Sequence, residues 1–343
     1  MGKSTGPVVR ASVGSPESPS VGDLNDLRRQ RIEGAGPLHV LGGRKVNRKV
    51  TGPALEEGPS GRLADAPGTN GNAARPDPTV SLVIPAKNEA RNLPLVLAAV
   101  PDDLHEVILV DGNSSDDTVE VARASYPGIT VIGQTRKGKG NALACGFAAA
   151  TGDFIVMLDA DGSTDPAEIP RFVDALKHGA DFAKGSRFMP GAGSSDISRL
   201  RQYGNYWLNR IVNLLYGTRY TDLCYGYNAF RRDCLETICL DPSGGEDTDP
   251  TAMQWGDGFE VETLINLRIA KAGLRVFEVP SFERNRVYGS SNLNAFSDGL
   301  RVLRTIHIER KRGVRRATAQ STNLPRDPGE SWSVLSTFAQ EAS

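Results

Sequence analysis

Strand-like and helix-like segments alternate between residues 80 and 177, and this alternation constrains the fold more than any other feature of the chain. Short apolar runs rich in β-branched residues predict buried strands at 80–84, 106–110, 129–132 and 153–158. Stretches typical of helices follow them at 90–98, 118–125, 139–150 and 166–177. Such alternation predicts an α/β domain, in which a doubly wound, mostly parallel sheet is flanked by helices.

The two ends of the chain differ in composition from this central part. Residues 1–78 are rich in Gly, Pro, Ser and charged residues, and their few apolar residues follow no helical or strand period. Such a segment cannot bury enough surface to offset the entropy lost on ordering. We therefore predict a disordered N-terminal extension at 1–78, one folded domain at 79–313, and a flexible C-terminal tail at 314–343.

Charge and hydropathy exclude several classes of partner. The 40 basic and 41 acidic residues nearly cancel, so no overall electrostatic argument favours nucleic acid. No apolar stretch approaches the roughly 18 residues that a membrane-spanning helix needs, and the N-terminus lacks an apolar signal core. The four cysteines show neither zinc-finger spacing nor a disulfide framework. These features predict a cytoplasmic protein without a transmembrane helix, with peripheral attachment to the cytoplasmic face of a membrane as an alternative.

Polar residues gather where the predicted strands end. Lys87 and Glu89 follow the first strand, Asp111 ends the second, and Asp159 and Asp161 follow the fourth. In open sheets of this kind, ligands bind at the carboxyl ends of the strands. The pattern therefore predicts one site to which several strand ends contribute.

The pair Asp159 and Asp161 carries the clearest chemistry. Two carboxylates spaced i, i+2 after an apolar strand can approach one cation from a tight loop. Mg²⁺ and Mn²⁺ prefer carboxylate oxygen and commonly bridge it to a diphosphate. The motif therefore predicts a Mg²⁺ or Mn²⁺ site, where the metal would neutralise charge on a nucleoside-diphosphate leaving group.

A second motif allows a rival interpretation. The segment GQTRKGKG at 133–140 nearly matches the phosphate-binding loop of nucleotide hydrolases, but Gly140 stands where a Ser or Thr should hold the metal. A nucleotide hydrolase is therefore disfavoured. Lys139, near the start of a predicted helix, is still placed to contact a nucleotide or phosphate.

Taken together, the motifs resemble those of family 2 glycosyltransferases, which have the GT-A fold. The segments that carry the resemblance occur in the family's order: VIPAKNE at 83–89, VDGNSSDDT at 110–118, KGKGNA at 137–142, DAD at 159–161 and GSRF at 185–188. Three further segments resemble the dolichyl- or polyprenyl-phosphate sugar transferase branch: TDLCYGYNAFRR at 221–232, GFEVE at 258–262 and RVYGSS at 286–291. The resemblance covers about residues 79–313.

The resemblance implies roles for individual residues on the donor side. Pro85, Lys87 and Glu89 fall where the family holds base and ribose, and Asp111 falls where it contacts the nucleoside. The DxD segment, made of Asp159, Ala160 and Asp161, falls on the metal and diphosphate positions.

Further positions follow from the same resemblance. Ser163 falls on a more variable metal-side position, and Arg286 would contact the donor diphosphate. Arg187, and with it Arg199 on the next helix, would meet the acceptor phosphate. The expected catalytic residues are Asp161, Arg187 and, for a hydroxyl acceptor, Asp257.

The activity implied is inverting transfer of a hexose from a GDP- or UDP-sugar to polyprenyl or dolichyl phosphate. Asn292 stands where many relatives carry Lys, which leaves the acceptor open. A hydroxyl of a soluble or secondary-metabolite acceptor is the alternative, with Asp257 or else Glu262 as general base. A nucleotidyltransferase would show a Gly-rich basic loop after the first strand, which is missing here. A non-catalytic sugar-nucleotide-binding protein is a more remote alternative.

One predicted helix, at 199–216, carries an apolar stripe. The stripe consists of Leu200, Tyr203, Trp207, Ile211, Leu214 and Leu215. Burial of the stripe against the α/β core is the expected use, and contact with a membrane is the alternative.

Overall fold

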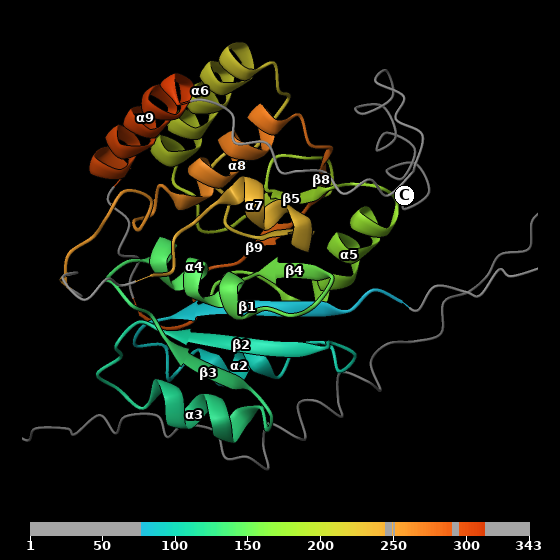
Figure 1. Ribbon diagram of the computed structural model, residues 1–343, viewed down its shortest axis with the longest axis vertical. Helices are drawn as coiled ribbons and strands as arrows, with labels where there is room; N and C mark the ends of the chain where they lie inside the picture. Colours follow the sequence, from blue (N-terminus) through green and yellow to red (C-terminus); the bar gives the residue numbers. More distant parts are fainter. Residues whose placement is uncertain (1–76, 244–248, 250, 290–294, 313–343) are drawn as a thin grey trace, which may run out of the picture. The chain divides into compact units, whose positions relative to one another are not determined.

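The computed structural model describes residues 77–243, 249, 251–289 and 295–312. The predicted C-terminal tail lies outside the described residues, as does the predicted N-terminal extension except for its last two residues. The described part contains a seven-stranded sheet and a two-stranded sheet, and helices pack against both faces of the larger one; Figure 1 labels these elements.

The sheet is mixed, with strand order β3-β2-β1-β4-β7-β5-β8. Its strands are β1 (Val80–Ala86), β2 (Glu106–Asp111), β3 (Thr130–Gly133), β4 (Phe154–Met157), β5 (Phe182–Ser186), β7 (Asn228–Arg231) and β8 (Val276–Pro280). Strand β7 runs antiparallel to both of its neighbours, and the other pairings are parallel. The predicted α/β fold with a mostly parallel sheet is confirmed.

Successive side chains of β1 alternate between two hydrophobic cores, as expected for a strand buried on both sides. Leu82 and Ile84 belong to the core under α2 (Leu93–Leu97), α3 (Thr118–Ser125) and α5 (Ile169–Lys177). Val83 belongs to the opposite core, under α4 (Lys139–Ala149). Each is fully or almost fully buried, so the near-continuous apolar character of this strand is explained.

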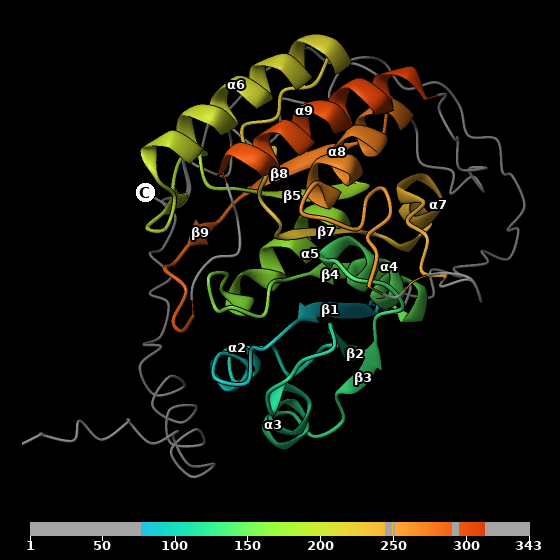
Figure 2. The ribbon, with the colours of Figure 1, turned by 90° about the vertical axis from the view of Figure 1, so that its left-hand side faces the viewer.

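The second core continues under the C-terminal helices. These are α6 (Arg199–Tyr216), α7 (Leu235–Ile238), α8 (Val261–Ala272) and α9 (Ala295–Lys311). Figures 1 and 2 show α6 and α9 side by side at one end of the domain, with α8 between them and the sheet. None of the described helices combines the length and the apolar character that crossing a bilayer requires.

Local departures from the predicted elements have local causes. The helix expected at 90–98 begins only at Leu93, because Asn88 has a φ of 58° and the chain turns before Pro94 can enter a first helical turn. The helix expected at 166–177 begins as the 3₁₀ turn η1 (Pro166–Glu168), and the side chain of Asp165 caps it. Short elements β6 (Gly193–Ser194), η2 (Arg232–Cys234) and β9 (Phe282–Glu283) complete the described fold.

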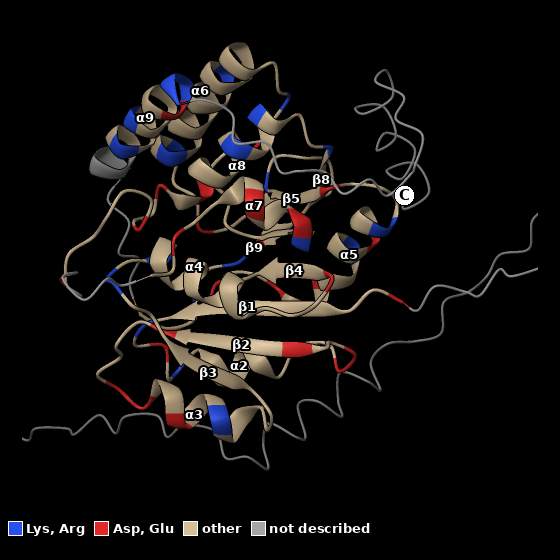
Figure 3. Ribbon diagram, viewed as in Figure 1, with Lys and Arg blue, Asp and Glu red and all other residues tan. Residues whose placement is uncertain are grey.

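The register places the strand ends at one edge of the sheet. Ala86 at the end of β1 pairs with Asp111 at the end of β2, and Met157 at the end of β4 pairs with Val83. The loops with the predicted site residues therefore start from neighbouring strands. Figure 3 shows basic residues along α6 and α9, which lie at the opposite end of the view from α3.

Candidate active site

The loops after β1 and β2 are hydrogen-bonded to each other. The amide of Asn88 donates to Ser114 Oγ at 2.9 Å, and Asn88 Oδ1 accepts from the amide of Ser115 at 2.7 Å. The carboxylate of Asp111 accepts from the amide of Ser114 at 3.2 Å and 3.3 Å. Asn88 has a left-handed backbone, which Asn adopts more readily than most residues. The hydrogen bonds between the two loops hold the Ser114 amide against Asp111 and so position its carboxylate.

The first aspartate of the DxD segment belongs to a chain of three charged groups. Lys139 Nζ lies 2.7 Å from Asp159 Oδ1 and 2.6 Å from Glu262 Oε1, so the ammonium bridges two carboxylates. A Cβ placed on Gly226 would lie 3.2–3.4 Å from atoms of all three side chains. The backbone at Gly226 therefore packs directly against this bridge.

The second aspartate belongs to a parallel chain. Arg286 donates to Asp161 Oδ2 at 2.8 Å and to Glu89 Oε1 at 3.2 Å. Asp161 Oδ1 accepts from the amide of Ser163 at 2.9 Å. The structure thus brings together three residues that lie up to 197 positions apart in the sequence.

Burial and charge shift the pKa of the groups in these chains. Burial lowers the pKa of Lys139, but the charges of Asp159 and Glu262 outweigh burial and hold it above its ordinary value. Burial raises the pKa of the Glu262 carboxyl, and burial likewise raises that of Glu89. Lys139 is therefore held in its charged form. The charged forms of Glu262 and Glu89 are favoured by Lys139 and Arg286 respectively.

The DxD segment fits a divalent cation by the chemistry of its donors. Among the described residues no group of three or more His, Cys, Asp or Glu side chains could hold a metal ion, so a cation at the two aspartates would need further ligands from substrate or water. Mg²⁺ is usually bound by one or two carboxylates, with substrate phosphates and water supplying the rest. Asp159 retains 31% side-chain exposure and Asp161 14%, so both can be reached by such a cation.

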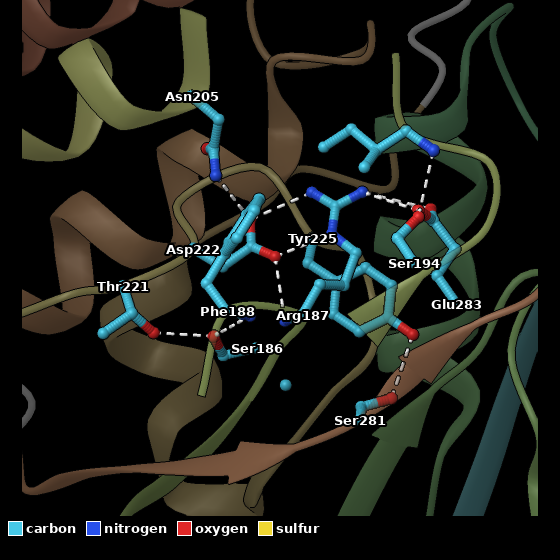
Figure 4. A network of polar contacts seen from close by, with 12 residues as sticks. Ser186, Arg187, Phe188, Ser194, Asn205, Thr221, Asp222, Tyr225, Ser281 and Glu283 are labelled. Carbon is cyan, nitrogen blue, oxygen red and sulfur yellow. Dashed lines mark hydrogen bonds and ion pairs between the residues drawn. The ribbon is translucent and has the colours of Figure 1, made fainter. Parts of the chain in front are cut away.

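Arg187, an expected contact of the acceptor phosphate, lies in a buried network (Figure 4). Its Nε lies 2.7 Å from Asp222 Oδ2 and its Nη2 lies 3.0 Å from Asp222 Oδ1, while Nη1 lies 3.0 Å and 3.1 Å from the two oxygens of Glu283. Asn205 on α6 donates to Asp222 Oδ1 at 3.0 Å. The side chain of Arg187 is only 4% exposed. The guanidinium is therefore already paired with two carboxylates of the protein.

The remaining expected donor and acceptor residues differ in their exposure. Lys87 and Arg199 are exposed, and Pro85 is half-buried within β1. Ala160 is buried, and only 3% of its surface is exposed. Arg199 is the first residue of α6.

Asp257, the expected base for a hydroxyl acceptor, is also committed. Its carboxylate accepts from Arg136 Nε at 3.0 Å and from Arg136 Nη2 at 3.1 Å, and the residue is 3% exposed. It lines a cavity of about 220 Å³ together with Arg268 and Arg312, and neither DxD aspartate lines that cavity. This geometry does not place the carboxylate of Asp257 with the other candidate site residues.

The glycines of the segment 137–142 are explained by the packing of its backbone. A Cβ on Gly138 would lie 2.1 Å from Asp257 O, and one on Gly140 would lie 1.8 Å from Gly256 O. The amide of Gly140 donates to Asp257 O at 2.8 Å. The two glycines let this loop contact the segment before α8, and the loop thereby carries Lys139 to the DxD segment.

Sequence reasoning missed three charged residues of this region, which are Arg136, Asp222 and Glu283. Asp222 lies inside the segment at 221–232 that carries part of the resemblance, so a signal for it was present. Glu283 ends β9 in a region without a quoted motif, and Arg136 lies inside the segment GQTRKGKG at 133–140. Only the fold shows that these residues form buried pairs.

Comparison with known proteins places the chain in a family. Residues 81–239 match the family model described as glycosyl transferase family 2. The chain is 32% identical to undecaprenyl-phosphate mannosyltransferase of Micrococcus luteus over 224 residues, which cover 63% of this chain and 87% of that protein. It is 31% identical to polyprenol monophosphomannose synthase of Mycolicibacterium smegmatis over 244 residues, which cover 68% of this chain and 88% of that protein. The chain belongs to family 2 of the glycosyltransferases.

Solved structures support the fold of this glycosyltransferase. Glucosyl-3-phosphoglycerate synthase of Mycobacterium tuberculosis, in complex with Mn²⁺, UDP and glucosyl-3-phosphoglycerate, superposes with a TM-score of 0.51. The identity is 22%, and the match covers 68% of this chain and 80% of that one. The GT-A fold that the motifs implied is thereby confirmed.

Proposed function

We propose that the enzyme transfers a hexose, with inversion, from a nucleotide-diphospho-sugar to a polyprenyl phosphate, and that Mg²⁺ or Mn²⁺ assists. The observation that carries the proposal is the pair of charged chains at the edge of the sheet, in which Lys139 contacts Asp159 and Arg286 contacts Asp161. A site that presents two carboxylates for a metal beside two cations is suited to a diphosphate. In this proposal Lys139 and Arg286 would contact the phosphate oxygens beside the metal.

The donor is held, in this proposal, by residues of three strand-end loops. Asp111 and the half-buried Glu89 and Pro85 hold the nucleoside, with the exposed Lys87 beside them. Asp159 and Asp161 would hold the metal, with Ser163 orienting Asp161 through its amide. A divalent cation in this position supplies charge stabilisation for the departing nucleoside diphosphate.

The ion pairs of the two candidate bases favour a phosphate acceptor over a hydroxyl. A phosphate is ionised near neutral pH and attacks without a general base, whereas a hydroxyl needs one. Asp257 lies 3.0 Å from Arg136 and Glu262 lies 2.6 Å from Lys139, so each candidate carboxylate already contacts a cation of the protein. Both relatives above are named for mannose transfer involving a polyprenyl or undecaprenyl carrier, which makes mannose the first sugar to test.

We propose that the activity resides within residues 79–313. We further propose that the reaction takes place at the cytoplasmic face of a membrane, because a polyprenyl chain is retained in the bilayer. Cell fractionation that finds the protein at membranes, released by high salt or alkali, would support this location. Recovery only in the supernatant at low salt would contradict it.

The test is a transfer assay with purified protein, vesicle-borne polyprenyl phosphate, and a panel of GDP- and UDP-hexoses. We expect a hexosyl-phosphoryl-polyprenol with one of these donors in the presence of Mn²⁺ or Mg²⁺, and loss of product with a chelator. Asp161→Asn should lose the product, while Asp174→Asn, at an exposed position of α5, should behave as wild type. Transfer only to hydroxyl compounds would refute the acceptor. Nucleotide-sugar binding without any transfer would favour the non-catalytic alternative.

A further inference from the structure

Helix α6 is oriented with polar residues toward the protein. Asn205, Asn209 and Asn213 lie on one face at intervals of four residues. Their amides donate in order to Asp222 Oδ1 at 3.0 Å, Thr221 O at 2.8 Å and Tyr220 O at 2.9 Å. Because this ladder of asparagines holds the backbone and side chain of 220–222, the inner face of the helix is fixed by hydrogen bonds.

The outer face of α6 is apolar and aromatic. Leu200, Tyr203, Trp207 and Leu214 are 73%, 63%, 51% and 84% exposed, at helical spacing along one stripe. The burial expected for this stripe is therefore wrong for these four positions. The physical reason is the asparagine ladder, whose hydrogen bonds decide which face of α6 points inward.

Helix α9 extends the same apolar surface. Leu300 and Leu303 are 64% and 44% exposed, whereas Val302 and Ile306 are buried in the second core. Tyr216 of α6 donates to Ile306 O at 3.0 Å, and Figures 1 and 2 both show the two helices side by side. We define the α6–α9 face as the exposed apolar residues of these helices: Leu200, Tyr203, Tyr206, Trp207, Leu214, Leu300 and Leu303.

Positive charge accompanies the α6–α9 face. Helix α6 contains three arginines and no acidic residue, and α9 contains four exposed basic residues (Figure 3). Of the two acidic residues in α9, Glu309 is buried and paired with Arg268 and Arg312. The exposed surface of the two helices therefore combines apolar side chains with a local excess of cations.

We propose that the α6–α9 face docks onto the surface of an anionic lipid bilayer. Helices that lie in a membrane interface combine basic residues with Trp, Tyr and Leu on an apolar face, and Tyr and Trp favour the headgroup region. A second copy of the chain is a poorer occupant. A two-fold contact would set each patch against itself and bring the arginines of α6 together.

Docking by this face would have a consequence for the site, and this consequence alone rests on the proposed lipid-phosphate acceptor. Asn205 of α6 contacts Asp222, and Asp222 binds Arg187 in the GSRF segment (Figure 4). The docked helix is thus tied by two hydrogen-bonded contacts to the segment that the resemblance assigns to the acceptor side. Arg187 serves here as a positioning residue rather than a catalytic one.

The test is co-sedimentation of the full chain with phosphatidylglycerol vesicles and with phosphatidylcholine vesicles. We expect binding to the anionic vesicles that weakens at high salt, and little binding to the neutral ones. Leu200→Gln/Trp207→Gln/Leu214→Gln should abolish binding without unfolding, because all three side chains are exposed. Arg210→Gln/Arg304→Gln should weaken it by about fivefold per arginine. The matched control Arg123→Gln, on the exposed face of α3, should bind as wild type.

Tryptophan fluorescence gives an independent readout. The emission of Trp207 should shift to the blue on anionic vesicles, and Trp207→Phe should keep binding but lose most of the shift. Vesicle binding that survives the triple substitution would overturn the proposal. So would a stable dimer in light scattering that the triple substitution dissociates.

Different results would refute the docking of the α6–α9 face and the proposed function. If both hold, the triple variant loses transfer to vesicle-borne polyprenyl phosphate but keeps transfer to a water-soluble short-chain prenyl phosphate. Vesicle binding without transfer to either acceptor would leave the docking face standing and refute the proposed function. Equal transfer by wild type and triple variant on vesicles, with no vesicle binding by either, would refute the docking face alone.

Discussion

Replacing Arg187 with methionine should destabilise the fold strongly. The substitution removes the contacts of the guanidinium with Asp222 and Glu283 at 2.7–3.1 Å. Asp222 is fully buried in the folded domain. Methionine fills a similar volume, so the measured effect reports on charge and hydrogen bonding more than on a cavity.

The magnitude follows from the burial of this network. Breaking a buried ion pair by removing one partner typically costs about 3–5 kcal/mol, because the other charge stays buried. For a domain of this size each kcal/mol lowers the melting temperature by about 2–4 °C, so we expect a loss of about 10 °C. Arg275→Met is the matched control. Its pair with Asp181 is 44% and 21% exposed, and removing such a pair should cost no more than about 1 kcal/mol.

Urea unfolding gives the free energy of unfolding of both variants, and thermal unfolding gives their melting temperatures, each followed by circular dichroism. If Arg187 instead extended to an acceptor phosphate, Arg187→Met would unfold like wild type and lose only transfer activity. Equal stability of the two variants would therefore refute the structural role assigned to Arg187. Adding Asp222→Asn to Arg187→Met should recover part of the loss, since the unpaired charge is then removed.

Three further predictions concern the carboxylates and the glycine beside them. Asp161→Ala should lower kcat by about 100-fold or more while the protein still folds, because it removes a proposed metal ligand; near-wild-type turnover in a steady-state assay would contradict a metal at this position. Gly226→Ala should lower the rate of transfer with little change in the free energy of unfolding, since its Cβ would lie 3.2 Å from Lys139 Nζ. Full activity would show that Lys139 can shift without loss of function. Burial raises the pKa of Asp222, but Arg187 outweighs burial and holds it below its ordinary 3.8. The stability from Asp222 is therefore present above that pH and lost as the pH falls below it, so Asp222→Asn should flatten the acid limb of a stability-against-pH curve.

The sequence predicted the frame of the site because strand ends follow from local pattern. The apolar runs that end at Asp111 and Asp159 are short and β-branched, and parallel strands bring their carboxyl ends to one edge. Helix 199–216 was predicted with the bounds that α6 has. The antiparallel β7, only Asn228–Arg231, carries no pattern of its own that reveals its direction.

Tertiary partners explain what the sequence did not reveal. An arginine in the GSRF segment has the same local pattern whether it faces solvent or a buried carboxylate, and the partners of Arg187 lie 35 and 96 positions away. The apolar stripe of α6 likewise suggested burial. The asparagines on the opposite face decide its orientation only because residues 220–222 offer them partners.

The most direct test of the account is mass-spectrometric detection of the lipid product. Purified enzyme is supplied with Mn²⁺, GDP-mannose or another nucleotide hexose, and polyprenyl phosphate in anionic vesicles, with Asp161→Asn in parallel. We expect the mass of a hexosyl-phosphoryl-polyprenol from the wild type, with an inverted anomeric configuration by NMR, and no such product from Asp161→Asn. A hexosylated hydroxyl compound in place of that lipid, or equal product from Asp161→Asn, would contradict it.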